Sequence, residues 1–162
     1  MREIIDDIVR ASKNKTLTIF AGAGLSMAAN LPSWNDLVRE FADKLGMGKK
    51  KGYTTDELLI IPQKYYYTDK KDYYKIINKV FRSTKYTPTF VHDQLLALQP
   101  KSIITTNFDN LIEQAALRSC RTYKVVAQEE DVAKIEGYPF ILKAHGDAQI
   151  GNYVLKEEDY LR

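Results

Sequence analysis

The chain has 162 residues, 44% of them hydrophobic and 28% charged, a composition typical of one globular domain with its own core. The net charge of +3 is small and dispersed, so we expect no nucleic-acid partner. The single cysteine, Cys120, excludes an internal disulfide and a zinc site of several cysteines, and it favours a reducing, cytoplasmic location. Residues 1–10 do not form a secretory signal, and no apolar run approaches the roughly 20 residues that span a bilayer, so we expect no membrane partner.

The N-terminal part predicts a helix, a strand and two further helical segments. Residues 2–12 carry apolar side chains at helical spacing. Thr16 to Phe20 is a short β-branched, apolar run of the kind found in buried parallel strands, and residues 26–29 suit the first turn of a helix. Ser33 is a suitable N-cap for a helix that continues through Leu45.

The middle of the chain, from about residue 54 to 100, predicts a helical insertion. Two candidate helices span residues 56–67 and 69–82, and a third spans residues 88–98. Pro62 lies inside the first of these, so we expect that helix to be kinked or to start after the proline. The tyrosines between Tyr65 and Tyr74 favour packing between two helices over a base-stacking platform.

Strands and helices alternate through the remaining residues. Residues 102–106, 123–127 and 139–143 predict strands, residues 110–118 predict a helix, and residues 129–135 suit a short crossover helix. This alternation indicates an α/β fold with a Rossmann-like parallel sheet and right-handed crossovers.

A glycine-rich turn, Gly22-Ala23-Gly24-Leu25-Ser26, follows the first strand. Glycines let a backbone approach a phosphate closely, and the amides and dipole at a helix N-terminus attract its charge. The turn lacks the third glycine of the dinucleotide fingerprint and the lysine of a Walker loop, so glycine used only for backbone geometry stays an alternative.

Two more polar motifs follow predicted strands: Thr106-Asn107-Phe108-Asp109 and His145-Gly146-Asp147. In open α/β sheets, ligands bind at the carboxyl ends of the strands. Three polar motifs at equivalent strand ends therefore predict one site.

The ordered set Gly22-Ala23-Gly24-Leu25-Ser26, Thr106-Asn107-Phe108-Asp109 and His145-Gly146 resembles the motifs of sirtuins. The similarity is greater to the sirtuin-like domains of bacterial defence proteins against phage, and it extends over residues 16–161. It includes the segments 31–34, 105–109, 143–147 and 154–160.

The resemblance implies an NAD+ glycohydrolase that cleaves the bond between nicotinamide and ribose as an antiviral defence effector. It assigns Asn107 and His145 as catalytic residues, with His145 taking a proton from water or a ribose hydroxyl. It assigns NAD+ binding to a set that shares short or polar side chains: Gly22, Ala23, Gly24, Ser26, Asn107 and Asp109. From the residues alone, Asn107 and Asp109 also suit a helix-capping role, and His145 a turn.

Other functions stay open. Ser33-Trp34-Asn35 stands where deacylating sirtuins have an acidic-aromatic-arginine run, and the chain has no cysteine pairs for their zinc, so NAD+-dependent deacylation is the weaker alternative. A non-catalytic nucleotide-binding or assembly module is the stronger one. We expect no metal site.

The resemblance also bears on the extent of the fold. Domains of this kind continue past the His-Gly strand with further Rossmann strands, so we expect a single domain, residues 1–162, that lacks the C-terminal part of the fold. Such a domain would work with a further domain, a partner subunit or a second copy of itself.

Overall fold

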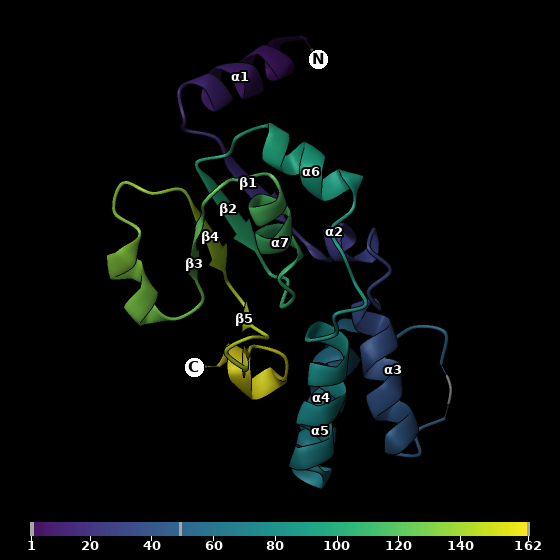
Figure 1. The fold of residues 1–162 in the computed structure, drawn as a ribbon. Coiled ribbons are helices and arrows are strands. Elements are labelled where there is room, and N and C mark those ends of the chain that lie inside the picture. Colours follow the sequence, from purple (N-terminus) through teal and green to yellow (C-terminus); the bar gives the residue numbers. More distant parts are fainter. Residues whose placement is uncertain (1, 49, 162) are drawn as a thin grey trace.

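The computed structural model describes residues 2–48 and 50–161 (Figure 1). Its strands are β1 (Thr18–Ala21), β2 (Ser102–Thr105), β3 (Lys124–Val126), β4 (Phe140–Lys143), β5 (Gly146–Asp147) and β6 (Asn152–Tyr153). Its α-helices are α1 (Arg2–Lys13), α2 (Ala23–Met27), α3 (Trp34–Lys44), α4 (Thr55–Thr68), α5 (Lys70–Phe81), α6 (Phe90–Ala97) and α7 (Leu111–Arg118). Two 3₁₀ helices are η1 (Glu129–Lys134) and η2 (Glu157–Tyr160).

The central sheet has four parallel strands in the order β1-β2-β4-β3. Its register aligns Ala21, Thr105 and Lys143, the last residues of three neighbouring strands. The loops that follow these strands therefore start from one edge of the sheet. The prediction of an α/β fold with a Rossmann-like parallel sheet is confirmed.

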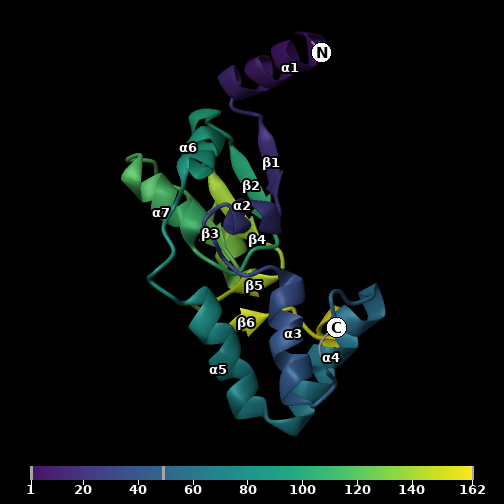
Figure 2. The ribbon, with the colours of Figure 1, turned by 90° about the vertical axis from the view of Figure 1, so that its right-hand side faces the viewer.

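Helices α6 and α7 lie together against one face of the sheet (Figure 2). Ile103 and Ile141 project to that face and are fully buried, where they pack with Leu96 of α6 and with Ile112 and Ala115 of α7. Side chains alternate between the two faces along a strand, so Phe20 of β1 points to the opposite face of the sheet, where it is 68% exposed. Within the described residues, the helices thus cover one face far better than the other.

Helices α3, α4 and α5 form a separate body beyond the carboxyl edge of the sheet, here called the helical body (Figure 1). Phe41 of α3 stacks on Tyr65 of α4 at 5.3 Å and on Tyr73 of α5 at 5.1 Å between ring centroids. All three side chains are buried. Tyr65 and Tyr73 therefore pack helices together, as the helical spacing of the tyrosine run predicted.

Three local features differ from what the sequence suggested. Helix α4 begins at Thr55, ahead of Pro62, because Thr54 and Glu57 form a capping box that fixes its start. Of the two alternatives for this helix, a kink at the proline or a start after it, the second is wrong. Helix α1 forms as predicted, but it buries none of its residues. The hairpin β5–β6 was not predicted, because each of its strands has only two residues.

None of the helices in the described ranges combines the length and apolar character needed to cross a bilayer.

Candidate functional site

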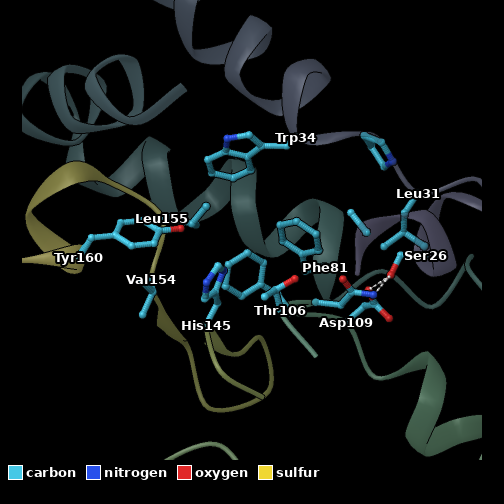
Figure 3. Close-up of a pocket in the computed structure, with 14 residues that line it drawn as sticks. Ser26, Leu31, Trp34, Phe81, Thr106, Asp109, His145, Val154, Leu155 and Tyr160 are labelled. Atoms are coloured by element: carbon cyan, nitrogen blue, oxygen red, sulfur yellow. Dashed lines mark hydrogen bonds between the residues drawn. The ribbon is translucent and has the colours of Figure 1, made fainter. Parts of the chain in front are cut away.

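The three predicted motifs meet at the carboxyl edge of the sheet. They line one pocket of about 230 Å³, which also touches the helical body through Trp34 and Phe81 (Figure 3). The turn after β1 contributes Ala23 and Ser26, the loop after β2 contributes residues 106–109, and the loop after β4 contributes His145. The sequence prediction of one shared site agrees with this placement, since parallel strands bring the loops to one edge.

The side chains of Asn107, Ser26 and Asp109 form a chain of buried hydrogen bonds. The Asn107 amide nitrogen donates to the Gly22 carbonyl at 3.1 Å and to the Ser26 hydroxyl at 2.8 Å. The Ser26 hydroxyl in turn donates to Asp109 Oδ2 at 2.6 Å. Because a carbonyl can only accept, the Gly22 contact fixes which end of the Asn107 amide is nitrogen.

This order leaves the amide oxygen of Asn107 available. Both of its amide hydrogens have acceptors, and its Oδ1 has no hydrogen-bond partner among residues 2–48 and 50–161. Asn107 lines the pocket and is only 7% exposed. The residue therefore presents a fixed hydrogen-bond acceptor to whatever fills the pocket.

Asp109 has a structural role in this network. Its Oδ1 accepts from the Leu111 amide at 3.1 Å, at the start of α7, while its Oδ2 accepts from Ser26. The capping role that the sequence left open for Asp109 is thus present. The same interpretation does not apply to Asn107, whose side chain turns back to the first loop.

The glycine turn leaves open space above its backbone. A Cβ placed on Gly22 or Gly24 would meet no heavy atom within 4 Å. Gly22 immediately precedes α2, and the first amides of a helix have no partner within it. The turn can therefore receive an acceptor-rich group at close range.

His145 is half-buried between two aromatic rings. Its ring centroid lies 6.5 Å from that of Phe108 and 5.5 Å from that of Tyr160, which meets it edge-on. Burial lowers the pKa of His145 below its usual value of 6.5, so the ring is neutral at pH 7. Its nitrogens make no hydrogen bond to any residue that the structure describes, and the ring can accept a proton.

The glycine after His145 is required by the backbone. Gly146 has φ +94°, and a Cβ there would lie 1.7 Å from the carbonyl oxygen of Asn152 in the neighbouring strand β6. The hairpin β5–β6 thus sets where His145 leaves the sheet. The second histidine, His92, lies outside the pocket and accepts from the Thr89 amide at 3.2 Å, a contact at the start of α6 that indicates a structural role.

Sequence reasoning missed several residues that line or support the site, among them Trp34, Phe81 and the two described next. Tyr160 of η2 forms part of the pocket wall, and Lys143, at the end of β4, lies buried beneath the loops. A lysine that ends an otherwise apolar strand is a detectable anomaly, because a fully buried lysine is rare unless paired. Among the described residues, no group of three or more histidine, cysteine, aspartate or glutamate side chains is placed to hold a metal ion.

The fold and the pocket define an α/β domain of Rossmann-like architecture with a site at the carboxyl edge of its sheet. Residues 101–162 match the family model of the SIR2-like domain. The match covers less than half of the chain, and the relatives described next are similar to it over nearly its whole length.

Two curated relatives show the nature of the similarity. Defense-associated sirtuin 2 of Bacillus subtilis is 39% identical over 164 residues, covering 98% of this chain and 16% of that protein. NAD(+) hydrolase ThsA of Bacillus cereus (strain MSX-D12) is 29% identical over 162 residues, covering 96% of this chain and 33% of that protein. The chain thus spans a third or less of the length of either relative.

Among solved structures, one described as "Structural Basis for the Mechanism and Regulation of Sir2 Enzymes" is also similar. It shares 18% identity and a TM-score of 0.45, over 88% of this chain and 47% of that one.

Proposed function

We propose that this domain hydrolyses NAD+ to nicotinamide and ADP-ribose, with Asn107 and His145 as its catalytic residues. The observation that carries the proposal is the amide oxygen of Asn107, which has no hydrogen-bond partner in the described part of the chain and lies in the same pocket as the neutral ring of His145, beside an open glycine turn. The names of the relatives, a defence-associated sirtuin and an NAD+ hydrolase, support the same reaction and a role in defence against phage.

The reaction needs few chemical contributions from the protein. The bond between the nicotinamide nitrogen and ribose C1′ breaks, and its electron pair neutralises the pyridinium as nicotinamide leaves. Water then adds to the oxocarbenium-like C1′ and loses a proton. The site must orient the ribose, place the water and accept that proton.

Each group has a role that suits its surroundings. The fixed Oδ1 of Asn107 accepts a hydrogen bond from the attacking water or from a ribose hydroxyl. His145 accepts the proton, because burial keeps its ring neutral. Gly22, Ala23 and Gly24 hold the diphosphate through their backbone, while Ser26 and Asp109 complete the binding site by fixing Asn107.

The proposal extends to the setting of the domain. We propose a single cytoplasmic domain whose helical insertion, about residues 54–100, forms one side of the pocket. It acts within a longer protein, or with a partner subunit or a second copy, since the relatives are at least three times as long.

The test is nicotinamide release from NAD+ by wild type, Asn107→Ala and His145→Ala. We expect each substitution to lower turnover at least ~100-fold, the lower range for removing one positioned catalytic group. Full activity in both variants contradicts the assignment. NAD+ binding without turnover by the wild type favours a non-catalytic module, and acyl transfer from an acetyl-lysine peptide favours a deacylase.

Two matched controls accompany these variants. Asn110→Ala removes an asparagine that lies outside the pocket and whose side chain accepts from Gln114 Nε2 at 2.6 Å. His92→Gln removes the other histidine but keeps a polar acceptor at the third residue of its helix, where glutamine completes a capping box. Both controls are expected to retain wild-type turnover.

A further inference from the structure

Lys143 is the last residue of β4 and comes two residues before His145. Its side chain is completely buried, with 0% exposure, and it does not line the pocket. Four oxygens surround its ammonium group: Asp109 O at 2.6 Å, Glu113 Oε1 at 2.9 Å, Asp147 Oδ2 at 3.1 Å and Phe108 O at 3.3 Å.

These acceptors belong to the loop after β2, to strand β5 and to helix α7. The carbonyls of Phe108 and Asp109 follow Asn107 directly in the loop after β2. The Asp147 carboxylate lies in the segment that carries His145, and Glu113 is in the first turn of α7. A single ammonium group therefore connects the two segments that carry the proposed catalytic residues.

Packing alone does not explain a lysine at this position. Its strand neighbour on the same face, Ile141, is buried in an apolar cluster, and burying an ammonium group is costly even when it is paired. Apolar side chains of similar volume often replace buried ion pairs without loss of stability. What an apolar side chain lacks is the ability to hold carbonyl and carboxylate oxygens from both loops at fixed distances.

We propose that Lys143 is a positioning residue that sets the placement of Asn107 relative to His145 for NAD+ cleavage; this rests on the proposed function. The backbone also joins the loops, through a hydrogen bond from the Ala148 amide to the Phe108 carbonyl at 2.9 Å. Loss of the ammonium group therefore loosens the connection without severing it. The resulting change is expected in the geometry of catalysis more than in the binding of substrate.

The experiment compares Lys143→Met with wild type in steady-state NAD+ hydrolysis and in amide hydrogen exchange. We expect kcat to fall roughly 10- to 100-fold while KM stays within about 3-fold, because displacement of a catalytic group by about 1 Å costs on the order of 100-fold. Exchange should accelerate at least about 10-fold, as expected for local opening, in residues 106–111 and 145–149, but not in the helical body.

Leu96→Ala is the control for general destabilisation. Leu96 is 1% exposed and packs against the sheet on α6, outside the pocket, so its truncation should lower the melting temperature while kcat is retained. If Lys143→Met leaves Glu113 and Asp147 unpaired and fails to fold, the triple variant Lys143→Met/Glu113→Gln/Asp147→Asn removes those charges and carries the same expectations.

A kcat within 2-fold of wild type in the folded variant, or unchanged exchange in both loops, overturns the proposal. If the wild type releases no nicotinamide, the proposed function fails, and the exchange measurement alone decides whether Lys143 connects the loops.

Discussion

Replacement of Ser26 by alanine tests the buried hydrogen-bond chain beneath the pocket. The Ser26 hydroxyl is the central member, since it accepts from Asn107 at 2.8 Å and donates to Asp109 at 2.6 Å. Ser26 is 6% exposed, so water cannot readily replace the hydroxyl. In Ser26→Ala, Asp109 Oδ2 loses its donor and one amide hydrogen of Asn107 loses its acceptor.

The expected loss follows from these two contacts. A neutral hydrogen bond contributes about 1 kcal/mol net, and one to a charged group contributes about 2 kcal/mol. The sum of about 3 kcal/mol is an upper-range value, because Asp109 keeps its bond from the Leu111 amide and Asn107 keeps its bond to Gly22. For a domain of this size, each kcal/mol lowers the melting temperature by about 2–4 °C, so we expect a decrease of roughly 6–12 °C.

Thermal unfolding of Ser26→Ala beside Ser33→Ala provides the test. Ser33 also donates to an aspartate at 2.6 Å, that of Asp36, but in an exposed capping box at the start of α3. Loss of such a cap costs about 1 kcal/mol, or roughly 2–4 °C here. The two variants thus differ mainly in burial. An equal or smaller decrease for Ser26→Ala refutes the reasoning that the buried chain holds the loops.

Two further predictions concern the ligand and the proton. Gly24→Ala should keep the melting temperature of the wild type, because its Cβ meets nothing within 4 Å and alanine favours a helix, but it should weaken NAD+ binding at least about 5-fold by calorimetry. The control Gly52→Ala, at a glycine that is equally open but distant in sequence from the site, should bind NAD+ with wild-type affinity. Wild-type affinity in Gly24→Ala contradicts a diphosphate at this turn. The kcat/KM of the wild type should fall as pH decreases through the pKa of His145, which burial places below 6.5, because protonation removes the base. A pH profile that begins to fall above pH 7 contradicts that role for His145. So does the same inflection in a residually active His145→Ala.

The central strands could be predicted from sequence because their signals are local. Residues 102–106 and 139–143 are short apolar runs between polar or proline-containing segments, and the structure has β2 and β4 within a residue of those bounds. The candidate helix over residues 56–67 begins within a residue of α4, but Pro62 left a start after the proline as an alternative. There a capping box eight residues earlier determined the outcome, and the helix tolerates the proline within it.

The meeting of the three motifs was also predictable, but the hydrogen bonds inside the site were not. Parallel strands place their carboxyl ends at one edge, whatever the side chains that follow. By contrast, the resemblance assigned Ser26 to NAD+ binding, whereas its hydroxyl donates to Asp109, a residue 83 positions later. Such competition between acceptors depends on distances that only the packed loops define.

The tripeptide Asn107-Phe108-Asp109 shows how one short loop serves both halves of the molecule. Its two polar side chains point to Ser26, while Phe108 belongs to the buried core of the helical body and packs on Phe81 at 5.1 Å between centroids. The position of Asn107 is therefore set from one side by the sheet and from the other by the helical body. The pocket lies between these two bodies, with Trp34 and Phe81 on one side and Asn107 and His145 on the other, so a change in how the bodies pack alters the space that the substrate would occupy.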